Sequence, residues 1–259
     1  MAVKKNKIKV WLVFAIPCLL VIVLSGSLLY VFRGGTSKGK TGHPTSPTAS
    51  TVTPTPTLTG TAPPQPLFFD DFVDSDKGWS LTSVSGYTRK IENGNLTLAD
   101  EKHNILTESL PTSATFNDFM VTVTFTLLQA NREDSVGIYM RGDSYLDHDY
   151  RLDIYGDNTY AISKEFLDQS REPQVDFLVN PTTTTALHPV GQQNIITIIM
   201  KGPKLVLIIN GSVVNSVLDT DYTSGQIALF VQNSETSSGV KASFSSVGVY
   251  PVPDKLPVG

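Results

Sequence analysis

The sequence predicts an all-β, two-sheet sandwich preceded by one transmembrane helix and a disordered linker. Three observations in the 259 residues predict this order. Residues 10–32 are apolar and uncharged, residues 33–66 are rich in Thr and Pro, and residues 67–251 alternate short strand patterns with turn residues. The ends are expected to be a basic cytoplasmic tail over residues 1–9 and a short tail over residues 252–259.

Charge is distributed unevenly along the chain, whose formal net charge is −4. Residues 1–66 contain seven Lys and Arg and no acidic residue, whereas residues 67–259 contain thirteen basic residues against 24 acidic ones. Because an acidic segment repels phosphate groups, the long C-terminal part is not expected to bind nucleic acid. The single cysteine, Cys18, excludes an intrachain disulfide and a cysteine-rich zinc site.

The uncharged run over residues 10–32 is long enough to cross a hydrocarbon core of roughly 30 Å as a helix. Basic residues before it favour a cytoplasmic N-terminus and an extracytoplasmic C-terminal domain. These residues are Lys4, Lys5, Lys7 and Lys9. The alternative is a signal peptide cleaved near Ser27, where small residues suit signal peptidase, followed by secretion. The apolar run is longer than the core of a usual signal peptide and continues past Ser27 to Phe32, which favours the uncleaved anchor in the cell membrane.

The predicted linker has almost no apolar area to bury. Within it, residues 34–66 contain ten Thr, three Ser, seven Pro and five Gly. Such a composition predicts disorder with local polyproline character. At about 3 Å per residue in that conformation, the linker would hold a domain several tens of ångströms from a membrane.

Strand signals begin at Leu67. The clearest is 119–128, in which apolar residues alternate with Met120 and three threonines, so one face is expected to be buried. Three hairpin turns are predicted from residues that tolerate positive φ. They lie at Asn93-Gly94, Gly156-Asp157-Asn158 and Asn210-Gly211. Trp79 is expected to plug the core near the first strand, and the Pro- and Thr-rich residues 171–189 are expected to form a long excursion between strands.

Several short segments in a fixed order carry a resemblance to a known family. In chain order they are Phe69-Asp70-Asp71-Phe72 with Gly78-Trp79, Asp118-Phe119, 137–141, 150–154, 207–211, Asp219, 225–229 and 244–249. The chain resembles the concanavalin A-like lectin/glucanase superfamily, and within it the 3-keto-disaccharide hydrolase domain. The resemblance implies a curved jelly-roll sandwich whose concave face or rim binds carbohydrate. Similar domains also occur outside the cell in membrane-anchored bacterial proteins without an implied activity.

The pattern of charged and aromatic residues predicts one binding face. If Ile138, Met140, Leu152 and Ile154 face the core, the alternating residues between and beside them share the opposite face. These are Tyr139, Arg141, Arg151, Asp153 and Tyr155, and Glu165 joins them if the next strand pairs in simple hairpin register. Aromatic rings and charged hydrogen-bonding groups suit a sugar. The other interpretation is a set of Arg–carboxylate pairs on a solvated sheet face.

Catalytic and metal-binding signals are sparse. Family 16 glucanases of this superfamily carry Glu-x-Asp-x-x-Glu on one strand, a pattern that is absent from this sequence. The remaining candidates for the two carboxyls of a glycosidase are Asp153 and Glu165. Asp143, Asp147 and Asp149 are the candidate ligands for Ca²⁺, but an acidic exposed turn is the competing interpretation, and we expect no metal or cofactor.

The sequence therefore predicts a membrane-anchored extracytoplasmic module that binds carbohydrate or another surface ligand without catalysis. Its expected partners are the membrane, through residues 10–32, and a glycan or other cell-surface ligand. A glycoside hydrolase or lyase of the 3-keto-disaccharide hydrolase type is the first alternative. A structural or adhesion head without a small-molecule site is the second.

Overall fold

The computed structural model describes residues 64–74 and 77–257, and this part is an all-β sandwich of two antiparallel sheets. The predicted anchor over 10–32 lies outside the described residues, as do the basic tail and nearly all of the linker. Within the described residues, no helix has the length and apolar character of a membrane span.

Fourteen strands make up the described part of the chain. They are β1 (Phe68–Asp70), β2 (Tyr87–Glu92), β3 (Asn95–Asp100), β4 (Ile105–Ser109), β5 (Phe119–Gln129), β6 (Ser135–Gly142), β7 (Asp149–Tyr155), β8 (Thr159–Leu167), β9 (Pro173–Thr183), β10 (Gln193–Lys201), β11 (Lys204–Ile209), β12 (Ser212–Leu218), β13 (Gln226–Gln232) and β14 (Val240–Tyr250).

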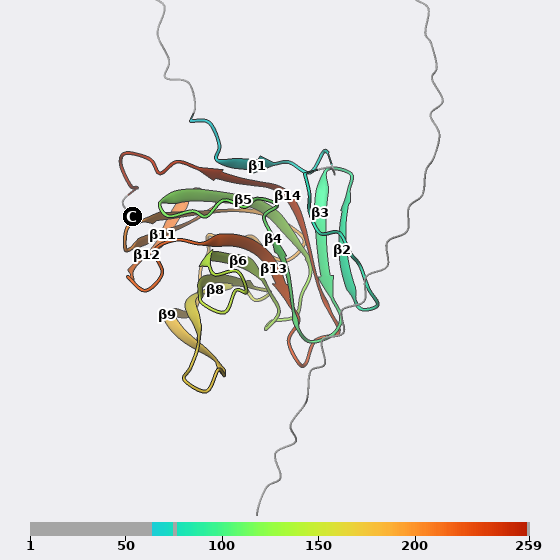
Figure 1. Cartoon of the computed structure of the whole chain (residues 1–259). Helices are drawn as coiled ribbons and strands as arrows, with labels where there is room; N and C mark the ends of the chain where they lie inside the picture. Colours follow the sequence, from blue (N-terminus) through green and yellow to red (C-terminus); the bar gives the residue numbers. More distant parts are fainter. Residues whose placement is uncertain (1–63, 75–76, 258–259) are drawn as a thin grey trace, which may run out of the picture. The chain divides into compact units, whose positions relative to one another are not determined.

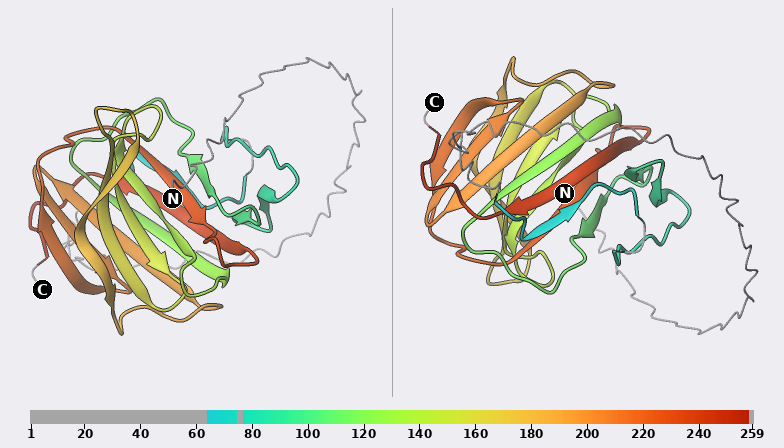
Figure 2. Two further views of the ribbon diagram at one scale, coloured as in Figure 1. Left: turned by 90° about the horizontal axis from the view of Figure 1, so that it is seen from below. Right: turned by 90° about the horizontal axis from the view of Figure 1, so that it is seen from above.

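The strand order places sequence-distant segments side by side. One sheet has the order β12-β11-β10-β5-β14-β3-β2, with β1 added along β14, and the other has the order β4-β13-β6-β7-β8-β9. Figure 1 shows both sheets curved, with the eight-stranded sheet on the convex side. Figure 2 shows the same two layers from below and from above. The outer face of the six-stranded sheet, which turns away from the core, therefore lies inside the curve.

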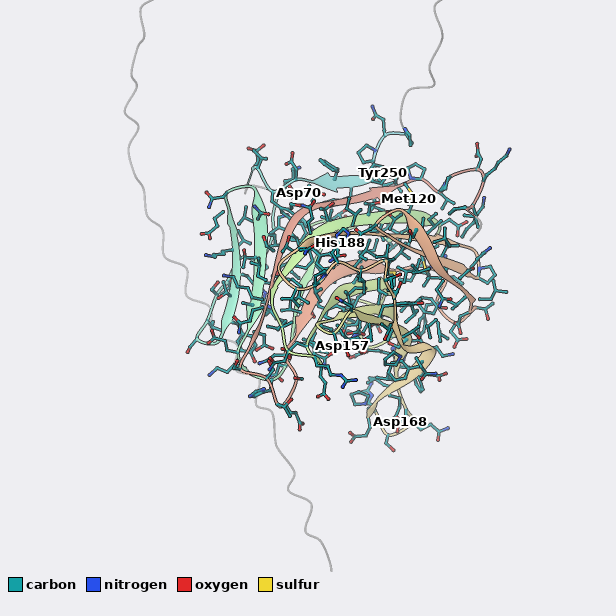
Figure 3. The ribbon with its side chains drawn as sticks, turned by 180° about the vertical axis from the view of Figure 1, so that it is seen from behind. Asp70, Met120, Asp157, Asp168, His188 and Tyr250 are labelled. Atoms are coloured by element: carbon teal, nitrogen blue, oxygen red, sulfur yellow. The ribbon has the colours of Figure 1, made fainter. Side chains whose placement is uncertain are left out.

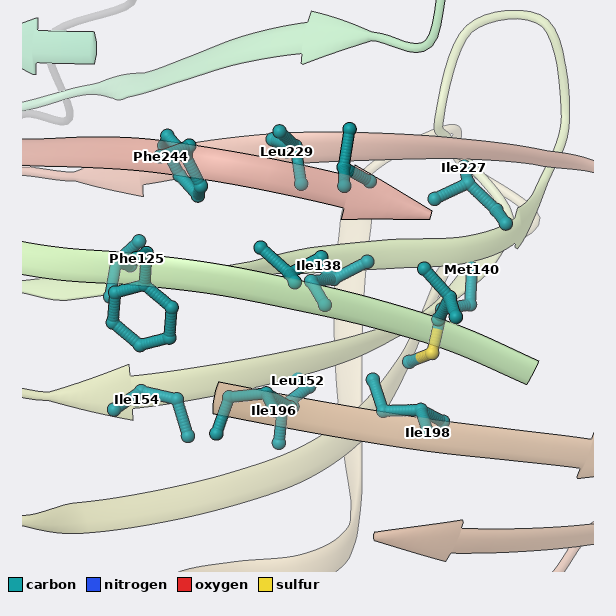
Figure 4. Packing of buried hydrophobic residues seen from close by; sticks show 14 of the residues in the cluster. Phe125, Ile138, Met140, Leu152, Ile154, Ile196, Ile198, Ile227, Leu229 and Phe244 are labelled. Atoms are coloured by element: carbon teal, nitrogen blue, oxygen red, sulfur yellow. The ribbon is translucent and has the colours of Figure 1, made fainter. Parts of the chain in front are cut away.

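The core fills the space between the sheets, as the alternating pattern predicts. Along β5 the buried positions are every second residue, beginning with Phe119 and Val121. From the facing sheet, Ile138 and Leu152 are 3% and 1% exposed, and Figure 4 shows them packed against residues of β5 and β10. Burying each such side chain contributes roughly 1.5–3 kcal/mol. The expectation that Ile138, Met140, Leu152 and Ile154 face the core is confirmed.

The three predicted hairpin turns are confirmed, and each uses backbone that only a few residues adopt easily. Asn93 and Gly94 join β2 to β3 with φ of 51° and 68°, and Asn210 and Gly211 join β11 to β12 with 48° and 83°. Asn158 has φ of 64° in the turn from β7 to β8. In the two Asn-Gly turns, positive φ at both central positions matches the right-handed twist of the paired strands.

Trp79 plugs one end of the core, as expected. It is 7% exposed, and its ring centroid lies 5.4 Å from that of Phe72 and 6.3 Å from that of Phe68. Its Nε1 donates a hydrogen bond of 2.7 Å to Oδ2 of the fully buried Asp70. Figure 3 labels Asp70 on β1, which lies along β14 with Asp70 opposite Val247. The first residues that carry the family resemblance, Asp70 and Trp79 among them, therefore hold β1 in place through this hydrogen bond.

The predicted excursion over residues 171–189 is wrong for most of its length, because β9 occupies Pro173–Thr183. β9 is the edge strand of the six-stranded sheet, where a proline without an N–H is tolerated. Pro173 is the first residue of the strand, and Pro181 lies at a register shift between the pairs Tyr160–Thr182 and Ile162–Val179. Proline and threonine thus mark a bulged edge strand here rather than a loop.

Candidate functional site

The outer face of the six-stranded sheet brings together four of the predicted binding residues. Tyr139 pairs with Arg151 across β6 and β7, and Glu165 of β8 lies opposite Asp149, the strand neighbour two residues before Arg151. Glu165 therefore has the simple hairpin register that the sequence predicts. Asp153 follows Arg151 on the same face of β7.

Arg151 is the centre of this cluster, although it is only 7% exposed. Its Nη1 donates to Glu165 Oε1 at 2.8 Å, and its Nη2 donates to Asp153 Oδ1 at 2.6 Å and to Gln232 Oε1. The guanidinium carbon lies 4.5 Å from the Phe230 ring centroid and 5.6 Å from that of Tyr139. Carboxylates and aromatic faces together compensate for the loss of hydration.

The electrostatics of the cluster keep Arg151 charged. Burial alone lowers the pKa of Arg151, but Asp153 and the other neighbours outweigh it, so its pKa lies above the usual value. Ser135 Oγ donates to the same Asp153 oxygen at 2.6 Å. Burial raises the pKa of Tyr139, so its hydroxyl keeps its proton at physiological pH. The cluster therefore presents a fixed charge pattern rather than a titrating one.

Asp149 is the exception, because it is fully buried and neither carboxyl oxygen has a hydrogen-bond partner among the residues that the structure describes. Burial, followed by repulsion from Glu165, raises the pKa of Asp149 to about 8. At neutral pH it is therefore mostly the neutral acid. We expected Asp149 in an acidic surface loop, yet the structure places it on the outer face beside Arg151 and Glu165.

A groove opens over this cluster, and we call it the face groove. It has a volume of about 380 Å³. Its lining includes Tyr139, Arg151, Glu165, Leu146, Leu167, Val175 and Ile105. Polar groups on the floor and apolar side chains on the walls match a ligand that has both hydroxyls and C–H faces.

Arg141 does not join the face groove, and this predicted placement is wrong. It lies at a register shift between β6 and β13 and has φ of 52°. Nη2 and Nε donate to Asn117 O at 2.6 and 2.9 Å, and Nη1 donates to the carbonyl oxygens of Gly202 and Tyr222 at 2.9 and 3.0 Å. A β-bulge interrupts the alternation on which the prediction relied, so the side chain ties loops together instead.

Tyr155 also lies away from the face groove. It follows Asp153 on β7 but opens onto another hollow, of about 410 Å³, with Arg132 and Pro181. Burial, and then Asp153, raises the pKa of Tyr155 to about 12. Asp153 itself is 3% exposed beneath the cluster, so of the six predicted residues only Tyr139, Arg151 and Glu165 line the face groove.

Comparisons with known proteins identify the family. The sequence pattern of the 3-keto-alpha-glucoside-1,2-lyase-like domain matches residues 64–244. The chain belongs to this family. The family resemblance of the sequence is therefore confirmed, together with the concanavalin-like jelly roll. No curated protein sequence matches the chain.

Solved structures resemble this 3-keto-alpha-glucoside-1,2-lyase-like domain in fold. The carbohydrate-binding module CBM66 from Bacillus subtilis has a TM-score of 0.51 and 15% identity, over 67% of this chain and 95% of its own. A Bacillus subtilis protein of unknown function with a galectin-like fold has a TM-score of 0.53 and 14% identity, over 73% of this chain and 97% of its own. A Bacteroides ovatus mixed-linkage-glucan GH16 protein, in complex with G4G4G3G product, has a TM-score of 0.52 and 11% identity, over 71% of this chain and 99% of its own.

The acidic loop of this lyase-like domain does not gather its carboxylates. Asp143 Oδ1 accepts from the backbone N–H groups of Tyr145 and Asp147 at 2.9 and 3.1 Å, while Asp149 faces the opposite strand. Burial raises the pKa of Asp143, but these N–H groups and His148 outweigh it, so the pKa is lowered. The described residues contain no group of three or more His, Cys, Asp or Glu placed to hold a metal ion.

Sequence reasoning missed the residues that β13 contributes to the site. The ring of Phe230 packs against the guanidinium of Arg151, and Gln232 accepts one of the hydrogen bonds that Arg151 donates. Both alternate with the core residues Leu229 and Val231, which is a visible strand signal. That signal does not say which strands neighbour β13, because its partners β4 and β6 are far away in the sequence.

Proposed function

We propose that this domain binds a glycan in the face groove without cleaving it. The observation that carries the proposal is the Arg151 cluster beneath a groove with apolar walls. Glu165, whose side chain is 19% exposed, offers carboxylate lone pairs to sugar hydroxyls while Arg151 fixes its position. Phe166 and Leu167 offer apolar contact to the C–H faces of a sugar ring.

The fold neighbours support a saccharide as the ligand class. One is a carbohydrate-binding module, and another was solved with an oligosaccharide product. Their low identity carries no residue from them to this chain, so the assignment of the site rests on its own geometry.

A lyase or hydrolase is the second candidate, and Asp149 is the observation that favours it. A neutral acid directly opposite the carboxylate of Glu165 resembles the acid–base pair that glycoside cleavage requires. However, both oxygens of Asp149 are covered, and Asp153 is engaged by Arg151 and Ser135. Binding without catalysis is therefore the better-supported function. A structural or adhesion head would leave the face groove unused.

The anchoring of the domain is also part of the proposal. The apolar residues 10–32 would hold the chain in a cell membrane with the N-terminus in the cytoplasm, and residues 33–66 would act as a stalk. Mass spectrometry of the mature N-terminus distinguishes this arrangement from cleavage near Ser27. A mature chain that begins after Ser27 would contradict the anchor and favour secretion.

A glycan array tests the binding proposal. The full chain is solubilised in a detergent without a sugar head group and compared with Glu165→Gln, which keeps the shape but removes the charge. We expect retention of a glycan and about a tenfold or greater loss of affinity in the variant, since a charge-assisted hydrogen bond contributes about 1.5–3 kcal/mol. Tyr145→Phe is the control, because Tyr145 is 81% exposed outside the groove.

Two array results would count against it. Absence of any retained glycan would contradict binding, and unchanged affinity in Glu165→Gln would move the ligand to another surface. Turnover of a 3-keto-disaccharide by the purified chain, lost in Glu165→Gln or Asp153→Asn, would instead support the enzymatic alternative.

A further inference from the structure

A second groove, which we call the edge groove, lies between the edge strands β2 and β4 of the two sheets. It has a volume of about 670 Å³, the larger of the two. Its lining includes Tyr87, Arg89, His103, Asn104, Ile105 and Gln232. These residues come from β2, from the turn between β3 and β4, from the start of β4 and from the end of β13. None of these residues belongs to the binding face that the sequence predicts.

The edge groove offers no free permanent charge to a ligand. Arg89 is the only Lys, Arg, Asp or Glu in its lining, and its Nε lies 3.2 Å from Oε2 of the buried Glu108. Its Nη2 donates to Thr107 O at 3.2 Å and its Nη1 to Thr82 O at 3.3 Å. Because Glu108 compensates the charge of Arg89, the two side chains present an ion pair rather than a net charge to a ligand. A neutral ligand fits better.

Uncharged groups in the edge groove keep hydrogen-bond donors and acceptors that the described residues do not use. Tyr87 Oη accepts from Asn104 Nδ2 at 2.8 Å, which leaves the tyrosine proton available. His103 Nδ1 lies 2.7 Å from the carbonyl oxygen of Ser234, so it must donate, and Nε2 of the neutral ring remains an acceptor. Gln232 Oε1 is taken by Arg151, and within the described part of the chain nothing accepts from its Nε2.

Such a mixture of single donors and single acceptors matches sugar hydroxyls, because each hydroxyl donates one hydrogen bond and accepts others. Apolar contact is also present, since the side chain of Ile105 is 39% exposed. Ile105 lines the face groove as well, and Gln232 contacts Arg151 on the floor of that groove. The two grooves therefore adjoin at Ile105, next to the contact between Gln232 and Arg151.

We propose that the edge groove binds a further neutral sugar unit of the same glycan chain whose first units occupy the face groove. This inference rests on the proposed function and deepens it, because it makes the ligand an oligosaccharide rather than a monosaccharide or disaccharide. A ligand that occupies both grooves would extend from Glu165, past Ile105, to Tyr87.

The test is a length series measured by titration calorimetry. Gluco-oligosaccharides with α-1,4, β-1,3 and β-1,4 linkages, each from two to six units, are titrated into the full chain in a sugar-free detergent. We expect the bound series to gain affinity about tenfold or more between two and four units. Tyr87→Phe should lower the affinity for the longer ligands about threefold to tenfold, as expected for one hydrogen bond, and leave the affinity for the disaccharide unchanged.

A second variant keeps the test independent of folding problems. His103 has φ of 56°, which Asn tolerates well, so His103→Asn removes the ring without straining the turn. It should act like Tyr87→Phe, while Tyr145→Phe should bind every length as the wild type does. Equal affinity for all lengths, or no loss in either variant, overturns the edge groove and leaves the face groove intact. Absence of binding at every length overturns both.

Discussion

Asp149 is the residue whose substitution tests the electrostatics of the face groove most sharply. It is fully buried and lies opposite Glu165, and in the described part of the chain neither of its oxygens has a hydrogen-bond partner. Asp149→Asn keeps the shape of the side chain and removes its ability to ionise. Because the neutral acid already predominates in the folded domain at neutral pH, the variant leaves the charge of the folded cluster nearly unchanged.

The size of the expected stability change follows from the pKa of Asp149. Burial raises the pKa of Asp149 from 3.8 to about 8, so the folded chain holds a proton that the unfolded chain has lost at pH 7. Each pH unit between the unfolded pKa and pH 7 costs about 1.4 kcal/mol, which gives up to about 4 kcal/mol. A raised carboxyl pKa means that stability falls as pH rises from about 4 to about 8. Asp149→Asn removes that fall.

Urea unfolding followed by tryptophan fluorescence measures the effect at pH 4, 5.5, 7 and 8. We expect Asp149→Asn to match the wild type near pH 4 and to be more stable by up to about 4 kcal/mol at pH 7. Asp157→Asn is a control of opposite sign. Burial acts to raise the pKa of Asp157, but hydrogen bonds from Thr159 and Arg132 outweigh it and lower the pKa. Parallel wild-type and Asp149→Asn profiles across this range would refute the reasoning.

Four further substitutions test other parts of the account. Trp79→Phe leaves the buried Asp70 oxygen without its donor and should cost about 1–3 kcal/mol in urea unfolding followed by circular dichroism, since it removes the tryptophan of the domain, whereas an unchanged midpoint would deny that bond a role. Gly137→Ala places a Cβ 2.0 Å from Leu152 O and 2.5 Å from the Phe230 ring, so it should cost about 3 kcal/mol or more. Gly202→Ala meets no atom within 4 Å and should cost only about 1 kcal/mol, and equal costs would contradict the crowding argument. Arg141→Lys loses the forked contacts to carbonyl oxygens and should cost about 1–3 kcal/mol with glycan affinity unchanged, so a selective loss of affinity in calorimetry would restore Arg141 to the site.

The sequence predicts best what depends on neighbouring residues. Alternation along β5 and the turn residues Asn93, Asn158 and Asn210 act locally, so strands and hairpins could be placed before their partners were known. The register of β7 and β8 follows from the turn between them, which is why the simple hairpin register predicted for Glu165 agrees with the structure.

What the sequence does not predict depends on strands that pair across long distances. The bulge at Arg141 arises from the pairing of β6 with β13, and it reverses the direction that simple alternation gives to the side chain. Gln232 reaches Arg151 for the same reason, since β13 inserts between β4 and β6. The edge position of β9 also explains why Pro181 bulges a strand rather than ending it.

Hydrogen–deuterium exchange of the full chain, with and without the best-retained glycan, tests the central claim most directly. If the glycan lies in the face groove, amide protection should appear in the loop over residues 143–148, in β8 and at the start of β9, which line the groove. Protection confined to β11 and β12, at the far edge of the other sheet, would contradict the account, as would an unchanged exchange pattern.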